Sequence, residues 1–173
     1  MRHKTIYLFL ALACFLGIIL IFIFDGYMGV YDSLRIDNGQ YVQTVDARQW
    51  QDQAEYGFYP SVSIDRDRSV DFTYKVENHR FSAYNAEVKV SLWYGVDKLA
   101  DVTAETINAG AFGSGEFDLV LDPGQYLPGD YPTDQSYNLT LVIERENIER
   151  KVMVYINPGT VVVPKAPVAI PSR

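Results

Sequence analysis

The chain has 173 residues, of which 15 are Lys or Arg and 22 are Asp or Glu, and its formal net charge is −7 at pH 7. This length suffices for one domain and a tail. All 22 acidic residues follow Phe24, and this acidic balance disfavours nucleic acid or another polyanion as a partner. The single cysteine, Cys14, lies in the first apolar run, which excludes a disulfide within the rest of the chain.

The first apolar run predicts a transmembrane helix over residues 5–24, with Thr5 and Phe24 at its ends. These residues carry no charge, and about 20 residues at 1.5 Å each span a hydrocarbon core of roughly 30 Å. A secretory signal peptide has an apolar core of only about 7–15 residues, followed by a small-residue cleavage site. The run therefore favours an uncleaved helix.

Cys14 raises one alternative, lipoprotein processing, in which the mature chain would begin at a lipidated cysteine. Ten further apolar residues, FLGIILIFIF, follow Cys14 and would then be exposed at the start of the mature chain. We therefore expect Cys14 to lie in lipid within the helix, and lipid attachment remains the alternative.

The residues that flank the helix predict its orientation. Arg2 and Lys4 precede it, whereas Asp25 follows it and the next cation is Arg35. Positive residues stay on the cytoplasmic side. Residues 1–4 are therefore expected to be a cytoplasmic stub. The bulk of the chain is expected outside the cytoplasmic membrane, joined to a single-pass helix in the bilayer by a linker over residues 25–33.

Beyond the linker, alternating apolar and polar residues predict an all-β domain over residues 34–157. Residues 34–45 contain Asn38-Gly39, a dipeptide that tolerates positive φ and is typical of hairpin turns. Residues 46–55 are polar and predict a short helix or an ordered loop.

Residues 57–64 contain a further alternating run. Pro60 lacks a backbone N–H donor, so this strand should lie at a sheet edge or have Pro60 at its start. The sequence leaves open whether residues 28–65 belong to the sandwich or form a separate hairpin near the membrane.

Two strands show the clearest alternation. In residues 69–78, Val70, Phe72, Tyr74 and Val76 share one face, and residues 83–94 alternate in the same way. One buried face and one wet face are typical of antiparallel sheets. Three further segments follow: a strand with a weaker signal over 98–105, a glycine-rich loop over 108–115, and a strand over 116–121 in which the residues alternate again.

Residues 137–145 and 150–156 predict a final strand pair. Their apolar faces match when Ile143 lies opposite Val152, a register that also pairs Glu144 with Lys151. Residues 158–173 are rich in proline and do not alternate, which predicts an extended, flexible tail.

Residues 69–156 resemble bacterial immunoglobulin-like modules of the CARDB and fibronectin type III kind. VDFTYKVEN resembles the strand ending in Val-x-Asn that opens many such modules, AEVKVSLWYG resembles the strand after it, and INAGAFGSGEFDL resembles their Ala-Gly segment and aromatic strand. In LPGDYPTDQSYNLTLVI, Tyr137 is similar to the tyrosine of the fibronectin corner, whose hydroxyl turns back to the preceding loop. The resemblance implies an immunoglobulin-like antiparallel β-sandwich that acts as an adhesion, spacer or interaction module.

Aromatic residues are the candidate partner contacts, because Tyr and Trp are enriched at interface anchors. Trp93 lies on the predicted polar face of its strand. The other four candidates lie close together in the segment before the predicted edge strand. The same aromatics could instead cap the core. The candidates are Trp50, Tyr56, Phe58, Tyr59 and Trp93.

Metal binding and catalysis are weaker possibilities. Asp122, Asp130 and Asp134 share one long loop that could supply oxygen ligands to calcium, although aspartates also start turns. His79 is the only imidazole after the helix and lies in a turn, whereas a serine or cysteine nucleophile needs a positioned base.

These observations predict a non-enzymatic, membrane-anchored β-sandwich without a cofactor. We expect it to bind a protein partner at the membrane or cell surface as an accessory or structural module. The alternative is a calcium- or glycan-binding surface module that uses the loop of residues 122–134.

Overall fold

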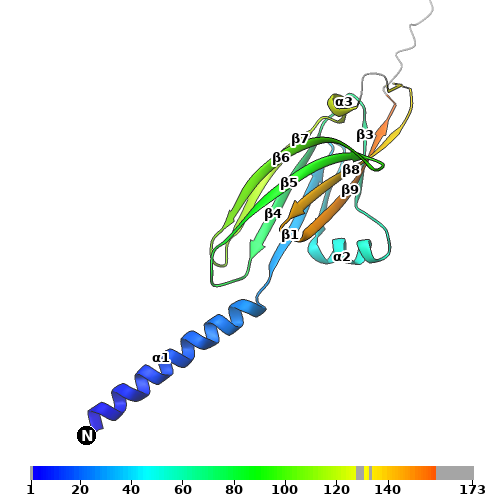
Figure 1. Ribbon diagram of the computed structural model, residues 1–173. Helices are drawn as coiled ribbons and strands as arrows, with labels where there is room; N and C mark the ends of the chain where they lie inside the picture. The colour runs from blue at the N-terminus through cyan, green and yellow to red at the C-terminus, as the bar shows by residue number, and fades with distance from the viewer. Residues whose placement is uncertain (1, 128–130, 133, 159–173) are drawn as a thin grey trace, which may run out of the picture.

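A computed structural model describes residues 2–127, 131–132 and 134–158. Figure 1 shows an apolar helix that projects from one end of a β-rich domain. Apart from Pro158, the predicted tail over residues 158–173 lies outside the described residues, and so does Met1 of the predicted stub. The described part of the chain contains three helices: α1 (Arg2–Tyr27), α2 (Ala47–Glu55) and α3 (Pro123–Tyr126).

Within α1, residues 6–25 form a segment of 20 residues that is long and apolar enough to cross a membrane. No residue of this segment is buried, and its large apolar side chains are exposed in the structure. The N-terminal apolar helix predicted from the sequence is confirmed.

Within the described residues, nine strands form two sheets. The four-stranded sheet has the order β2-β1-β4-β7 and contains β1 (Val30–Asp37), β2 (Val42–Asp46), β4 (Val70–Asn78) and β7 (Ser114–Leu121). The five-stranded sheet has the order β3-β9-β8-β5-β6 and contains β3 (Ser61–Asp65), β5 (Tyr84–Tyr94), β6 (Asp97–Ala109), β8 (Tyr137–Arg145) and β9 (Ile148–Asn157).

The core lies between the two sheets and is formed by the inward positions of each strand. In β4, every apolar residue that the alternation placed on one face is buried: Val70, Phe72, Tyr74 and Val76. Burial of one face of each sheet against the other is the favourable term that holds such a layered domain together. The prediction of a mainly β protein with alternating strands is confirmed.

The structure corrects the expected boundary between the linker and the domain. Strand β1 begins at Val30, inside the predicted linker over residues 25–33, and pairs with β4 over its whole length. The β1–β2 hairpin belongs to the four-stranded sheet, and β3 belongs to the five-stranded one. The residues that follow Gly29 are therefore part of the layered domain and not a separate hairpin.

Strand β3 also corrects the expectation that the sheets are wholly antiparallel. It pairs parallel to β9, with Val62 opposite Val154. The chain reaches this position by crossing from one sheet to the other through α2. Strand β3 lies at the edge of its sheet, and Pro60 immediately precedes it. Both positions agree with the prediction from the missing N–H of Pro60.

The predicted register of β8 and β9 is wrong by two residues. Leu141 lies opposite Val152, and Ile143 lies opposite Arg150. The shift arises because Glu146 adopts φ 54° and closes a tight turn with Asn147. A shift of two residues keeps the apolar faces inward but brings Glu144 opposite Glu149 and not opposite Lys151.

Two local features match the sequence. Helix α2 begins with a capping box in which Asp46 Oδ1 accepts a hydrogen bond from Gln49 N (2.9 Å), and Asp46 N donates to Gln49 Oε1 (3.4 Å). The Tyr137 hydroxyl donates to the carbonyl oxygen of Pro132 (2.8 Å), which is the backward turn that its similarity to the corner tyrosine implied.

Candidate partner-binding face

The outer face of the five-stranded sheet carries an open groove of about 420 Å³. It forms where outward-pointing side chains of β5, β8 and β9 meet the loop before β3, and we refer to it as the outer groove. Apolar side chains and charged side chains both line it. The lining side chains include Tyr59, Trp93, Val142, Met153, Thr140, Glu144, Glu149 and Lys151.

Trp93 lies at one side of the outer groove. Its alternation predicted that it points away from the core, and the structure confirms this, because Trp93 is half-buried on the outer face. The β5–β6 pairing has register shifts on both sides of Leu92, and such bulges re-aim nearby side chains. The Trp93 indole Nε1 donates to Ser91 Oγ (2.9 Å), which holds the ring over the sheet.

The apolar floor of the outer groove comes from β8 and β9. Val142 is buried although it points outward, because neighbouring side chains cover it. Met153 lies opposite Thr140, whose hydroxyl donates to its sulfur at 3.6 Å. Thioether side chains adapt to irregular apolar partners. This half of the groove therefore offers a deformable apolar surface.

Charged residues occupy the other half of the outer groove. Lys151 Nζ lies 2.8 Å from Glu149 Oε1, and this hydrogen bond raises the pKa of Lys151 above its ordinary value. Glu144 lies opposite Glu149 across the β8–β9 pair. The groove thus has an apolar half next to a rim with an excess of carboxylates, an arrangement that would complement a partner with an apolar anchor and a cation.

The structure brings two of the predicted partner residues together and separates the others. Tyr59 and Trp93 line the same groove, although they are far apart in the sequence. Tyr56 and Phe58 are exposed in the segment between α2 and β3. Exposed aromatic side chains in one short segment suit an interface but do not by themselves define one.

Trp50 is a correction. Its side chain is only 1% exposed, so it has no surface to offer a partner. The indole Nε1 donates to the Lys151 carbonyl oxygen (3.1 Å), and the Arg150 guanidinium lies 5.4 Å from the ring centroid. Trp50 therefore fastens α2 to β9, which is the core-capping role that its aromatic character also allowed.

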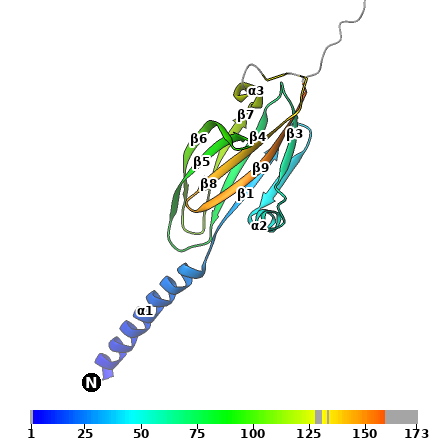
Figure 2. The ribbon, with the colours of Figure 1, turned by 45° about the vertical axis from the view of Figure 1, so that its right-hand side comes forward.

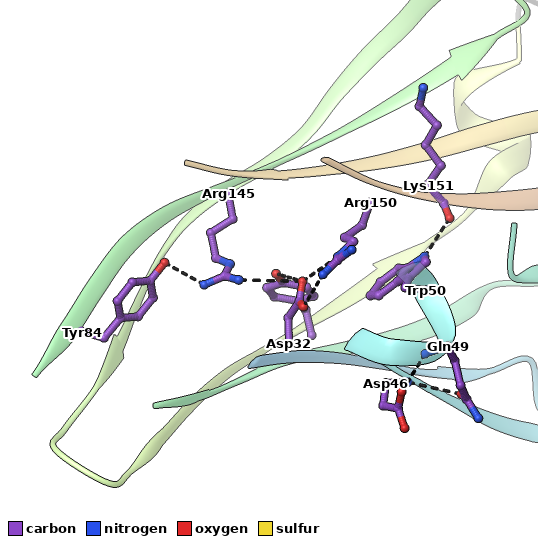
Figure 3. Close-up of polar contacts among 9 residues, drawn as sticks. Asp32, Asp46, Gln49, Trp50, Tyr84, Arg145, Arg150 and Lys151 are labelled. Carbon is purple, nitrogen blue, oxygen red and sulfur yellow. Dashed lines mark hydrogen bonds and ion pairs between the residues drawn. The ribbon is translucent and has the colours of Figure 1, made fainter. Parts of the chain in front are cut away.

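A buried polar cluster lies between the two sheets and joins them (Figure 3). Arg150 donates two hydrogen bonds to the Asp32 carboxylate, at 2.8 and 2.9 Å, and the Tyr74 hydroxyl donates a third at 3.0 Å. Arg145 Nη1 donates to the Tyr84 hydroxyl at 2.7 Å, and its Nη2 lies 3.9 Å from Asp32. Asp32 and Tyr74 belong to one sheet, and both arginines belong to the other.

Opposing influences act on the ionisation of Asp32. Burial raises the pKa of its carboxyl, but the hydrogen bonds and charge of Arg150, with the charge of Arg145, hold that pKa below its ordinary value. Burial and the neighbouring Asp32 charge raise the pKa of Tyr74, so its hydroxyl stays protonated and can donate. The cluster is therefore charged and hydrogen-bonded at neutral pH.

Alternation along the strands carries a signal for this cluster. Arg145 and Arg150 occupy positions of β8 and β9 whose side chains point inward. Asp32 occupies such a position in β1. A charged residue at a core position is almost always paired. The pairing itself is not visible in the sequence, because the predicted linker over residues 25–33 includes Asp32.

The loop proposed for calcium is only partly described. Asp122 caps α3: its Oδ1 accepts from Gly124 N (3.2 Å), and its Oδ2 accepts from the Gln125 side chain (2.7 Å). Asp134 is exposed, and Asp130 lies outside the described residues. In the part of the chain that the structure describes, no three acidic, histidine or cysteine side chains gather as a metal site.

His79 lies in the turn after β4. Its side chain is 3.7 Å from Glu77, and its ring stands edge-on to Tyr31, with centroids 5.1 Å apart. Neither neighbour is a nucleophile that an imidazole could activate by the serine or cysteine route.

The residues predicted to lie in the membrane all belong to α1. Cys14 is an exposed free thiol, and Phe24 is exposed near the end of the apolar segment. Thr5 lies in the first turns of the helix, and its side chain is outside the described part. An exposed apolar helix of this kind suits a membrane anchor and a signal sequence alike.

Comparison with known proteins gives no family. No family model and no curated protein matches the sequence. Among solved structures, the chain is similar to a β-glucosidase of Erythrobacter marinus, with a TM-score of 0.47, 9% identity, and coverage of 75% of this chain and 16% of that chain. It is also similar to the transglutaminase of red sea bream, with a TM-score of 0.34, 9% identity, and coverage of 65% and 18%. The chain spans less than a fifth of either protein.

Proposed function

We propose that this protein is a single-pass, membrane-anchored module that binds a protein partner outside the cytoplasmic membrane. In this proposal α1 is an uncleaved anchor with its N-terminus in the cytoplasm, and the outer groove receives the partner. The role is structural or accessory and not catalytic. The observation that carries the proposal is the convergence of Tyr59 and Trp93 on one groove of the outer face.

The anchor is supported by the length of the apolar segment and by its flanks. Twenty residues suffice to span the membrane, whereas signal peptides have shorter apolar cores. Arg2 and Lys4 precede the segment, which favours a cytoplasmic N-terminus under the positive-inside rule. The exposed apolar surface of α1 would be unfavourable in water and favourable in lipid.

The strand order supports an immunoglobulin-like topology. In such sandwiches of seven strands, the second strand pairs with the fifth in one sheet, and the third, sixth and seventh lie side by side in the other. Strands β4 to β9 correspond to the second to seventh strands of that fold. Here β4 pairs with β7, and β5, β8 and β9 are consecutive neighbours. The Tyr137 hydroxyl bond to Pro132 supports the same assignment, because a tyrosine corner recurs in this fold.

A protein is the partner that best suits the outer groove. Trp and Tyr are the residue types most often found as energetic anchors at interfaces, and such anchors are surrounded by polar rims. The groove pairs Trp93 and Tyr59 with the charged rim of Glu144, Glu149 and Lys151. A small-molecule site is instead usually an enclosed, mainly apolar pocket.

The test is purification of the full-length protein from its own membranes in mild detergent, with quantification of the proteins that accompany it. Trp93→Ala and Tyr59→Ala are compared with Val120→Ala, which alters an exposed side chain on the other sheet. We expect one membrane or surface protein to co-purify in a stoichiometric amount with the wild type and with Val120→Ala. Trp93→Ala and Tyr59→Ala should lose this protein. The intact mass of the bait reports whether the chain begins near Met1 or at a lipidated Cys14.

Other results would contradict parts of the proposal. Equal recovery of the partner with all three variants would exclude the outer groove as its binding site. A protein purified alone, but stabilised against heat by added calcium, would favour the calcium-binding alternative and the loop of residues 122–134.

A further inference from the structure

Two loops form the end of the domain that is nearest to α1. Residues 79–83 connect β4 to β5, and residues 110–113 connect β6 to β7. Figures 1 and 2 both show these loops beside the C-terminal end of the helix. We refer to residues 79–83 and 110–113 together as the proximal tip.

The proximal tip is held rigidly from inside. Asn78 is fully buried, and its side-chain amide donates to the carbonyl oxygens of Ser82 (2.7 Å) and Gly110 (2.8 Å), one in each loop. The Phe112 backbone N–H also donates to the Arg80 carbonyl oxygen at 3.1 Å. These bonds join the two loops into one unit with a defined shape.

This rigid unit presents an aromatic pair to its surroundings. The rings of Phe81 and Phe112 meet edge to face, with centroids 4.7 Å apart, yet the two residues remain 43% and 58% exposed. Phe112 also has φ 52°, a left-handed conformation that is rare for a bulky residue and is kept only where the surroundings enforce it. The fold therefore uses a strained backbone to hold apolar rings outward.

The proximal tip is tied to the end of the apolar segment of α1. The Asp25 carboxylate accepts hydrogen bonds from the backbone N–H groups of Phe81 and Ser82, and from the Ser82 hydroxyl at 2.9 Å. Arg80 Nε donates to the Met28 carbonyl oxygen at 3.2 Å. Asp25 is the last residue of the segment that could span a membrane. The backbone of Phe81 is thus hydrogen-bonded directly to Asp25, the residue at which that segment ends.

We infer that the proximal tip is a second membrane contact, in which Phe81 and Phe112 enter the lipid interface beside the end of α1. The inference rests on the anchor in the proposed function. A helix that spans the hydrocarbon core places its last residue at the boundary with the headgroups. Aromatic rings are stabilised at that depth, and an arginine there can place its guanidinium among the headgroups while its aliphatic stem lies along apolar surface.

The consequence is an oriented domain. A single helix and a flexible linker would leave the sandwich free to tilt, whereas the bonds of Asp25 and a lipid-seated aromatic pair fix two points on its base. The outer groove would then face a constant direction relative to the membrane. Only partners with a matching height and orientation could reach it.

The test uses the full chain in phosphatidylcholine vesicles, with the native thiol removed by Cys14→Ser. An environment-sensitive fluorophore is attached at Phe112→Cys or, as a matched control, at Val96→Cys. Val96 is 89% exposed in the turn between β5 and β6, at the opposite end of these strands. We expect the label at position 112 to emit at shorter wavelength and to lose intensity when the vesicles contain lipid with a spin-labelled headgroup. The label at position 96 should respond only to iodide in the water.

Flotation of the vesicles after an alkaline wash reports the anchor separately. A protein that floats, but whose label at position 112 responds like the label at position 96, overturns the membrane contact and leaves the anchor intact. A protein that does not float overturns both. A label at position 112 that is shielded from iodide and also unaffected by the spin-labelled lipid indicates a protein neighbour and overturns the lipid assignment.

A second variant tests the tie to the helix. Asp25→Ala removes the acceptor for Phe81 and Ser82 without altering either phenylalanine. Quenching at position 112 by the spin-labelled lipid should fall in this variant, because the tip is no longer held at the level of the helix end. Unchanged quenching would mean that the tip sits on the membrane without this tie, and would refute the role assigned to Asp25.

Discussion

Replacement of Asp32 by Asn should destabilise the domain more than any single change on its surface. Asn has nearly the same shape but carries no charge and keeps only one acceptor oxygen. Asp32 accepts two hydrogen bonds from Arg150 and one from Tyr74. The side chains of Arg150 and Arg145 are only 15% and 1% exposed, so water cannot replace the lost carboxylate.

The magnitude follows from the loss of one partner in a buried ion pair. Such a loss leaves an uncompensated buried charge and costs about 3–5 kcal/mol. For a domain of this size, that corresponds to a decrease in Tm of roughly 10–20 °C. The estimate exceeds the value for an exposed pair, about 0–1 kcal/mol, because the buried charges are not screened by solvent.

The assay is thermal unfolding of the full-length protein in detergent micelles, followed by circular dichroism in the β-sheet region. Asp71→Asn is the matched control, since Asp71 is exposed on β4 of the same sheet. The control should change stability by no more than about 0.5 kcal/mol. If Asp32→Asn unfolds within about 1 kcal/mol of the wild type, the cluster is not a stabilising junction, and the reasoning from its burial fails.

Three further predictions concern the same domain. Trp50→Ala should lower stability by about 3–5 kcal/mol in the same thermal assay, because it leaves a cavity between α2 and β9; a loss below about 1 kcal/mol would mean that α2 is not packed there. Tyr137→Phe should cost about 1 kcal/mol, since it removes only the hydrogen bond to the Pro132 carbonyl; urea unfolding measures this, and no change would contradict the bond. Because the pKa of Asp32 is lowered by folding, its contribution is complete above the unfolded carboxyl pKa of about 3.9 and is lost as pH falls through the folded value. The Tm of the wild type should therefore fall more steeply below about pH 4 than that of Asp32→Asn, and parallel curves would refute this account.

The polar cluster also bears on how the outer groove is positioned. Lys151 lines the groove on the outer face of β9, while its carbonyl oxygen accepts the Trp50 indole and its neighbour Arg150 bonds Asp32. The strand that carries part of the groove is therefore fixed to the other sheet by an ion pair and to α2 by a hydrogen bond. A groove on a rigid strand loses less conformational entropy when a partner binds than one on a loop does.

Features that depend on short stretches of sequence were predictable. The apolar segment of α1 was evident from its length, and β4 was evident from the alternation of Val70, Phe72, Tyr74 and Val76. The capping pair of Asp46 and Gln49 lies within one helical turn. In each case the residues that cooperate are close in the chain, so periodicity and spacing are sufficient signals.

Features that depend on distant residues were decided only by the tertiary structure. Alternation allows several registers for β8 and β9 that keep the same faces inward, and the positive φ of Glu146 selects one of them. The parallel pairing of β3 with β9 and the burial of Trp50 both follow from where α2 crosses between the sheets. Asp32 meets Arg150 across 118 positions of the chain. Side-chain alternation determines which face of each strand is buried. Only the assembled sheets determine which residue of the neighbouring strand or sheet lies opposite a given residue.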